Sequence, residues 1–219
     1  MKILVVPDTH GQINGLEVAR QKINEVDKIV FMGDYFDNFL LGFKGMKAAE
    51  NFKELVKFAR ENKDKVCLCI GNHDYDNYFL GGRCSGYQSG WFLEYNKLLA
   101  ENVDLLNVVY EFDGWWFSHA GVSKVWLNEL ENFEFSFISK ENWQKLSSVE
   151  KINYVFHKQF NEKGFVKRSF VDGIESWFTF NDYDYSCCGE YSKQGPLWIR
   201  PHTLLNYSAH DKQVVGHTE

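Results

Sequence analysis

Five short apolar segments, each followed within two residues by Asp, Asn or His, constrain the fold of this 219-residue chain more than any other feature. Their length and apolar character are typical of buried strands: 3–6, 29–32, 66–70, 115–117 and 213–215. The polar residues that follow them lie at 8–10, 33–34, 71–74, 118–119 and 216–217. Loops at strand ends carry the chemistry of many α/β folds. The pattern therefore predicts one functional site built from all five strand ends.

Helical patterns separate the first three predicted strands. Asn14 is positioned to cap a helix, and Glu17 three residues later completes a capping box. Apolar residues recur at helical spacing over 46–62, which indicates an amphipathic helix. Alternation of strand and helix predicts an α/β fold with parallel strands joined by right-handed crossovers.

The segments after 74 are more varied. Residues 75–90 show no periodicity and are expected to form a loop beside the site, followed by a helix over 91–100. The dipeptide Asp113-Gly114 predicts a hairpin turn between strands at 105–112 and 115–118.

Three further helices are predicted between 123 and 160, and serines are placed to cap them. These serines are Ser123, Ser139 and Ser148. We expect residues 124–191 to form an insertion or cap over the site, within a single domain that spans 1–219.

Composition limits the classes of function. A net charge of −6 argues against duplex nucleic acid as a partner, because phosphate neutralisation needs a basic face. The chain has no long apolar segment and no signal-peptide pattern, so we expect a soluble cytoplasmic protein without a membrane partner. Five cysteines, an odd number without regular spacing, fit a reducing compartment. Of these, Cys67 and Cys69 alternate within a strand and are expected to be small core residues.

The five polar blocks occur in a characteristic order. They are Asp8-x-His10, Gly33-Asp34-x-x-Asp37, Gly71-Asn72-His73-Asp74, His119-Ala120-Gly121 and Gly216-His217-Thr218. In this respect the chain resembles the calcineurin-like metallophosphoesterases, and in particular their bacterial and phage-type serine/threonine protein phosphatase branch. The resemblance implies an α/β/β/α sandwich of two mixed sheets flanked by helices, with a short C-terminal end.

The resemblance also implies a centre of two divalent metal ions. It assigns Asp8 and His10 to the first ion, Asp34 to a bridging position, and a last group of ligands to the second ion: Asn72, His119 and His217. Manganese is the expected metal, and iron or zinc would also suit these ligands. A hydroxide between the ions would be the nucleophile, since metal binding lowers the pKa of water.

Three residues receive other roles from the resemblance. His73 is the candidate general acid, Asp37 would orient it and keep it protonated, and Arg200 would bind the substrate phosphate through its planar guanidinium group. Together these features predict a hydrolase that acts on phosphomonoesters, either small phosphorylated molecules or phosphoproteins.

The sequence departs from the protein phosphatase pattern at three places. Asn38 stands where that branch carries an arginine, and Arg83 could replace it, although a solvated loop residue is the preferred interpretation of Arg83. Asp74 stands where the branch prefers glutamate. The sequence ends at Glu219, a position where many phosphodiesterases of the superfamily have a second histidine.

These departures keep two other functions open. One is a phosphodiesterase, nuclease or dinucleoside-polyphosphate hydrolase on the same scaffold. The other is a non-catalytic binding protein with an incomplete metal site.

Overall fold

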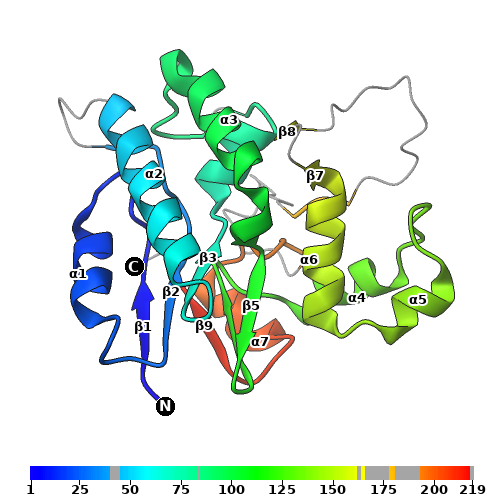
Figure 1. The fold of residues 1–219 in the computed structure, drawn as a ribbon. Helices are drawn as coiled ribbons and strands as arrows, with labels where there is room; N and C mark the ends of the chain where they lie inside the picture. Colours follow the sequence, from blue (N-terminus) through cyan, green and yellow to red (C-terminus); the bar gives the residue numbers. More distant parts are fainter. Residues whose placement is uncertain (40–44, 83, 162–163, 166–177, 181–192, 218–219) are drawn as a thin grey trace.

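The computed structural model describes residues 1–39, 45–82, 84–161, 164–165, 178–180 and 193–217. Its first sheet contains four parallel strands in the order in which they occur along the chain: β1 (Ile3–Val6), β2 (Lys28–Phe31), β3 (Val66–Cys69) and β4 (Leu106–Asn107). The crossovers between them contain α1 (Asn14–Lys22), α2 (Gly45–Glu61) and α3 (Phe92–Glu101). The predicted parallel α/β arrangement is confirmed (Figure 1).

Side chains alternate between the two faces of this sheet, as the pleat of a strand requires. One face, which includes Phe31 and Leu68, packs in the main core with the buried sides of α1 and α2, including Leu16 and Phe52. The opposite face packs against a second sheet in a cluster that contains Val30, Met32, Cys69 and Phe117. The strands are therefore buried on both sides, which explains why they appear as continuous apolar runs.

The second sheet is mixed. Its strands are β5 (Val109–Phe112), β6 (Trp115–Ser118) and β9 (Gln213–Val215). The first two form an antiparallel hairpin across Asp113 and Gly114, both with positive φ, as predicted, whereas β9 pairs with β6 in parallel. A parallel sheet packed on a mixed sheet agrees with the predicted sandwich, except that the first sheet is parallel throughout its described strands.

Helices and one short sheet follow β6. They are α4 (Lys124–Asn132), α5 (Lys140–Lys145), α6 (Ser148–Gln159), β7 (Phe160–Asn161), β8 (Gly164–Phe165) and α7 (Pro201–Tyr207). In Figure 1, α4, α5 and α6 lie to one side of the two sheets. Ser123 and Ser139 cap α4 and α5 as predicted, each accepting a hydrogen bond from a backbone N–H. The third cap is Ser147 rather than the predicted Ser148, and with Glu150 it forms a complete capping box.

Three further sequence-based predictions are wrong. The helix-capping role of Asn14 fails because the N-cap is Ile13, whose apolar side chain accepts no hydrogen bond. Residues 105–112 do not form one strand, since β4 joins the first sheet and β5 the second. The segment 75–90 is not only loop, because it contains most of a π-helix, η1 (Asp74–Phe79), and a 3₁₀ turn, η2 (Ser89–Trp91); a further 3₁₀ turn, η3 (Val103–Leu105), precedes β4.

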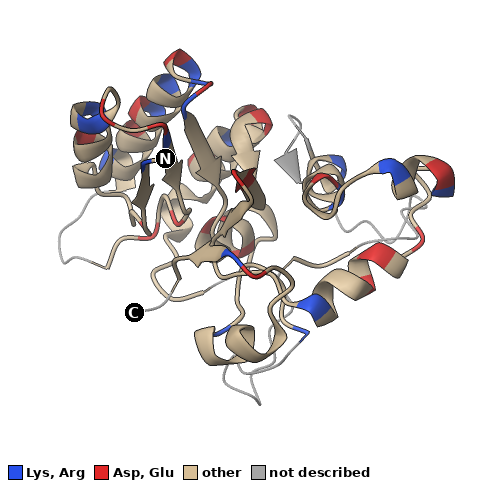
Figure 2. Ribbon diagram, turned by 90° about the horizontal axis from the view of Figure 1, so that it is seen from below, with Lys and Arg blue, Asp and Glu red and all other residues tan. Residues whose placement is uncertain are grey.

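Charged residues lie mainly on the helices, with acidic and basic groups interspersed, and the strands carry few of them (Figure 2). Cys67 and Cys69 are buried free thiols, as predicted. No helix among the described residues combines the length and the apolar character needed to cross a membrane.

Candidate metal centre and active site

Carboxyl ends of strands from both sheets meet at the candidate site. Five predicted ligands come together there: Asp8, Asp34, Asn72, His119 and His217. Ligand atoms of Asp8, Asp34 and His119 all lie within 4.8 Å of one another. Because the first three of the five follow β1, β2 and β3, and the last two follow β6 and β9, the site joins the two sheets.

The backbone at this site is unusual. Of the four non-glycine residues with positive φ in the described part of the chain, three are predicted ligands: His10, Asp34 and His217. The fourth, Asp113, belongs to the hairpin turn. Positive φ costs free energy for residues with a Cβ atom, and such conformations gather at functional sites.

The hydrogen bonds of His119 define which of its nitrogens faces the site. Its Nδ1 lies 2.8 Å from the carbonyl oxygen of Met32 and must donate to it, since a carbonyl only accepts. In the neutral ring, Nε2 then carries a lone pair, and the amide oxygen of Asn72 lies 2.7 Å from it. A carboxylate oxygen of Asp34 lies 3.5 Å from the same nitrogen.

With a neutral His119 ring, three hydrogen-bond acceptors are thus crowded together in a buried place: Nε2 of His119, Oδ1 of Asn72 and a carboxylate oxygen of Asp34. Such an arrangement is unfavourable unless a cation lies among the acceptors. Oxygen and imidazole nitrogen atoms are suitable ligands for manganese, iron or zinc. The residues present therefore fit a divalent metal ion.

His217 completes this side of the site. Its Nδ1 lies 3.1 Å from Nε2 of His119 and 3.1 Å from Oδ1 of Asn72, and its backbone N–H donates to Asp8. Burial and the neighbouring His119 lower the pKa of His217 to about 3, with a further contribution from the positive charge of Arg200. The ring is therefore neutral, as a metal ligand must be.

Arg200 lies near this histidine, two residues after Trp198. The Trp198 ring contacts the His217 ring edge-on, with 5.3 Å between centroids. This arrangement brings the predicted phosphate-binding arginine to the rim of the site, where it is half-buried.

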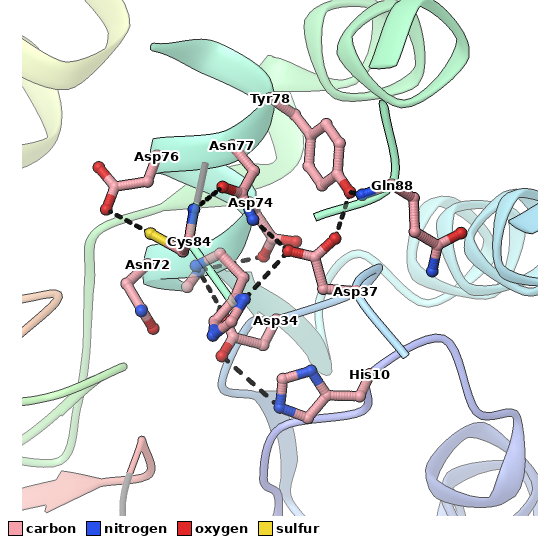
Figure 3. Close-up of polar contacts among 12 residues, drawn as sticks. His10, Asp34, Asp37, Asn72, Asp74, Asp76, Asn77, Tyr78, Cys84 and Gln88 are labelled. Atoms are coloured by element: carbon pink, nitrogen blue, oxygen red, sulfur yellow. Dashed lines mark hydrogen bonds and ion pairs between the residues drawn. The ribbon is translucent and has the colours of Figure 1, made fainter. Parts of the chain in front are cut away.

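Asp34 lies between the two groups of predicted ligands. Its Oδ2 is 3.9 Å from Nε2 of His10 and 3.5 Å from Nε2 of His119 (Figure 3 shows the His10 contact). Burial raises the pKa of Asp34, but His119, His73 and His10 lower it more, and the net direction is downward. A carboxylate that stays ionised between two imidazoles has the position expected of a bridging ligand.

His73 and Asp37 form a buried pair next to these residues. Asp37 is fully buried, and its Oδ2 accepts a hydrogen bond of 3.0 Å from Nδ1 of His73. Burial lowers the pKa of His73, but the bond to Asp37 and the charges of Asp34, Asp37 and Asp74 raise it to about 9. The backbone N–H of His73 also donates to Asp34, so the pair is fixed to the candidate metal centre.

Two residues that the sequence did not identify position Asp37. The amide of Asn77 and the hydroxyl of Tyr78 both donate to its carboxylate (Figure 3). Both belong to the π-helix η1, a distortion frequent at functional sites. The only available signal was the polar content of 74–78, which has no helical period.

Asp74 has a structural role. Its carboxylate accepts hydrogen bonds from the backbone N–H groups of Tyr35 and Gly71, at 2.8 and 3.2 Å, and so ties together the loops after β2 and β3. Burial and the nearby Asp34 raise the pKa of Asp74 well above its usual range. The choice of Asp at this position thus reflects loop geometry.

Asn38 is uncharged and so does not supply the positive charge of the arginine that the protein phosphatase pattern has at this position. Its side-chain amide donates to the backbone carbonyl of His10 and holds the loop after β1. The proposed substitute, Arg83, lies outside the described residues.

Comparison with known proteins identifies the family. The chain matches the model of the calcineurin-like phosphoesterases over residues 1–218. It is also similar to a solved structure, that of a metallophosphoesterase from Sphaerobacter thermophilus, with 18% identity and a TM-score of 0.31 over 55% of this chain and 47% of that chain. The match thus spans about half the length of that protein. A search of curated proteins found no match. The chain belongs to the calcineurin-like phosphoesterase family.

Proposed function

We propose that this protein hydrolyses phosphomonoesters with two divalent metal ions. Asp8 and His10 would hold one ion, Asp34 would be shared by both, and three residues would hold the second: Asn72, His119 and His217. When bound, the ions provide Lewis acidity and make water nucleophilic at neutral pH.

The acceptor atoms crowded beside the His73–Asp37 pair are the observation that carries this proposal. A cation accounts for the 2.7 Å approach of Asn72 Oδ1 to His119 Nε2, and the adjacent His73–Asp37 pair provides a proton donor beside it. Folding alone does not explain the cluster of acceptors, because unpaired buried acceptors destabilise a protein.

The chain's own residues have distinct roles in this proposal. His73 gives a proton to the leaving oxygen of the substrate, and Asp37 keeps the imidazole oriented and charged. General acids of this kind contribute about 10²- to 10⁴-fold in rate. Arg200 binds the phosphate oxygens and neutralises part of their charge.

Hydrolysis of p-nitrophenyl phosphate by purified, metal-loaded protein tests the proposal. We expect activity with Mn²⁺ that chelation removes and that Asp34→Asn abolishes. The control is Asp64→Asn, an exposed carboxylate just before β3, at the other end of that strand from the site. An Asp34→Asn protein as active as the parent would exclude the mechanism, and a metal-loaded protein that hydrolyses no phosphoester would favour the non-catalytic binding protein.

A phosphodiesterase is the second candidate. The observation that favours it concerns Asn38, whose side-chain amide donates to a backbone carbonyl. Asn38 is uncharged, so the site has one cationic side chain fewer for the dianion of a monoester than it would have with an arginine at this position. Rates on bis-p-nitrophenyl phosphate and p-nitrophenyl phosphate distinguish the two, and a strong preference for the monoester would count against the diesterase.

Finer assignments remain proposals of the same kind. The serine/threonine protein phosphatase branch rests on the motif order, and hydrolysis of phosphoserine and phosphothreonine peptides tests it. Manganese as the resident metal is tested by elemental analysis of the protein as purified. We also propose that 124–191 is an insertion that shapes substrate access within a single domain.

A further inference from the structure

An exposed aromatic ring borders the candidate active site. Phe39, directly after Asn38, is 56% exposed. Its ring contacts His10 and His73 edge-on, with centroid distances of 5.0 and 5.8 Å. A large apolar side chain beside the presumed proton donor, and open to solvent, is suited to contact a substrate.

The Phe39 ring is also held in position on one side. A Cβ atom added to Gly86 would lie 2.8 Å from Cε1 and 3.0 Å from Cζ of Phe39, so glycine permits this close packing. The same added atom would lie 3.3 Å from Cβ of Asp37. Phe39 is therefore packed against the loop at Gly86 and the two histidines, while more than half of its surface remains free.

A groove of about 700 Å³ lies beside this place, and Asn38, the neighbour of Phe39, forms part of its wall. The described residues that line it are mostly aromatic, apolar or amide, and none of them is Lys, Arg, Asp or Glu: Asn38, Gly45, Met46, Tyr87, Gln88, Ser89, Gly90 and Trp91. The groove is linked to the catalytic pair through Tyr78, whose hydroxyl donates to Asp37 and accepts the backbone N–H of Gln88 at 3.4 Å.

We propose that Phe39 and this groove bind an aromatic ring in the leaving group of the substrate. The inference rests on the proposed function, in which His73 protonates the leaving oxygen, because groups bonded to that oxygen must then pass beside Phe39. The described residues of the lining offer no charge to a polyanionic leaving group, whereas a flat ring gains stacking and apolar contact from Tyr87, Trp91 and Phe39.

Binding of phosphonates, which carry a carbon–phosphorus bond and are not hydrolysed as esters, tests the inference. Isothermal titration of the Mn²⁺-loaded protein compares phenylphosphonate with methylphosphonate. We expect about tenfold tighter binding of the phenyl compound, in line with the strength of aromatic pairs. Phe39→Ala should remove most of this preference and Phe39→Tyr should keep it.

A matched control is Leu93→Ala, since Leu93 is 81% exposed on α3 and does not line the groove. It should retain the full preference. An unchanged preference in Phe39→Ala, or the absence of any preference in the parent protein, would overturn the inference.

A third ligand separates two sources of the ring. The phosphonate analogue of adenosine monophosphate places a sugar between the phosphorus and the base. If Phe39→Ala weakens binding of this analogue more than binding of phenylphosphonate, the substrate is a nucleotide. If it weakens binding of phenylphosphonate more, the substrate is an aryl phosphate. Both outcomes support an aromatic leaving group.

The outcomes distinguish failure of the aromatic-site inference from failure of the proposed function. Loss of the Phe39-dependent preference in a protein that still hydrolyses p-nitrophenyl phosphate overturns the aromatic site and leaves the hydrolase. A Phe39-dependent preference in a protein without hydrolase activity supports the aromatic site and overturns the catalytic proposal.

Discussion

The residues around Asp37 show how a buried charge is kept without destabilising the fold. Its carboxylate is fully buried and receives hydrogen bonds from His73, Asn77 and Tyr78. The hydrogen bond to Asp37 and the nearby carboxylates raise the pKa of His73 to about 9, which favours its protonated form. In the proposed mechanism, these contacts prepare the imidazole to donate a proton.

Replacement of this imidazole should affect substrates unequally. We expect His73→Ala to lower kcat by about 10²- to 10⁴-fold on an alkyl phosphate, whose leaving group needs a proton. The loss should be smaller on p-nitrophenyl phosphate, whose leaving group is stable as an anion. Steady-state kinetics on both substrates checks this, with the exposed His202→Ala as control; equal losses on both would contradict a general-acid role.

The same pair predicts the pH behaviour of the metal-free protein. The folded-state pKa of His73 is about 9, against 6.5 for an unperturbed histidine. Because it is raised, its stabilising contribution is complete below pH 6.5 and is lost as the pH rises through 9. NMR titration of the imidazole after chelation should give a pKa near 9 that falls in Asp37→Asn. A wild-type value near 6.5 would refute the pairing, and bound cations should lower the value by repulsion.

At the scale of elements, the ends of strands could be predicted because continuous apolar runs and the polar residues that follow them are local patterns. The π-helix over Asp74–Phe79 could not, since its six buried residues have no helical period and are fixed by contacts with Asp37 and the aromatic core. The division between β4 and β5 could not be predicted from a local pattern either. Asn153 on α6 accepts the backbone N–H groups of Val108 and Val109 from 44–45 residues away in sequence.

Helix caps illustrate the limit of local rules and give a stability prediction. We expect Ser147→Ala to lower the free energy of unfolding by about 1 kcal/mol, because it removes the capping box of α6. Asn14→Ala should change it by less than about 0.5 kcal/mol, since Asn14 is exposed and caps nothing. Urea unfolding of both variants checks this, and an equal loss in Asn14→Ala would show that it does act as a cap.

The loops after β2 and β3 approach each other through glycines. A Cβ atom on Gly71 would collide with the backbone nitrogen and carboxylate of Asp34. We expect Gly71→Ala to weaken Mn²⁺ binding at least tenfold, because Asp34 must move. Gly90→Ala, with nothing within 4 Å of the added atom, should bind as the parent does. Calorimetric titration with Mn²⁺ decides, and unchanged affinity in Gly71→Ala would remove Asp34 from the ligand set.

At the scale of the whole molecule, the candidate centre connects two sheets that also meet through apolar contacts such as Met32 with Phe117. This convergence follows from topology and could be anticipated from the order of the motifs. The contributions of Asn77 and Tyr78, and the position of Phe39 between His10 and Gly86, depend on packing between distant segments. No local pattern encodes them.

Metal binding should therefore stabilise the entire fold. At a free Mn²⁺ concentration about 100 times Kd, the expected gain is about 2.7 kcal/mol, since the ion binds the folded state alone. Thermal unfolding with Mn²⁺ and with chelator should show a higher Tm in Mn²⁺, and Asp34→Asn should lose most of this difference. Equal Tm values for the parent under both conditions would mean that no ion bridges the sheets.

The placement of His217 directly after β9 has a consequence for biosynthesis. Asp8, Asp34 and Asn72 leave the ribosome early, but the edge of the second sheet that carries His217 is added only when β9 pairs with β6. A nascent chain thus displays Asp8, His10, Asp34 and Asn72 before His119 and His217 are available. In the proposed centre, complete loading with metal, and with it any hydrolytic activity, would be deferred until translation has passed β9.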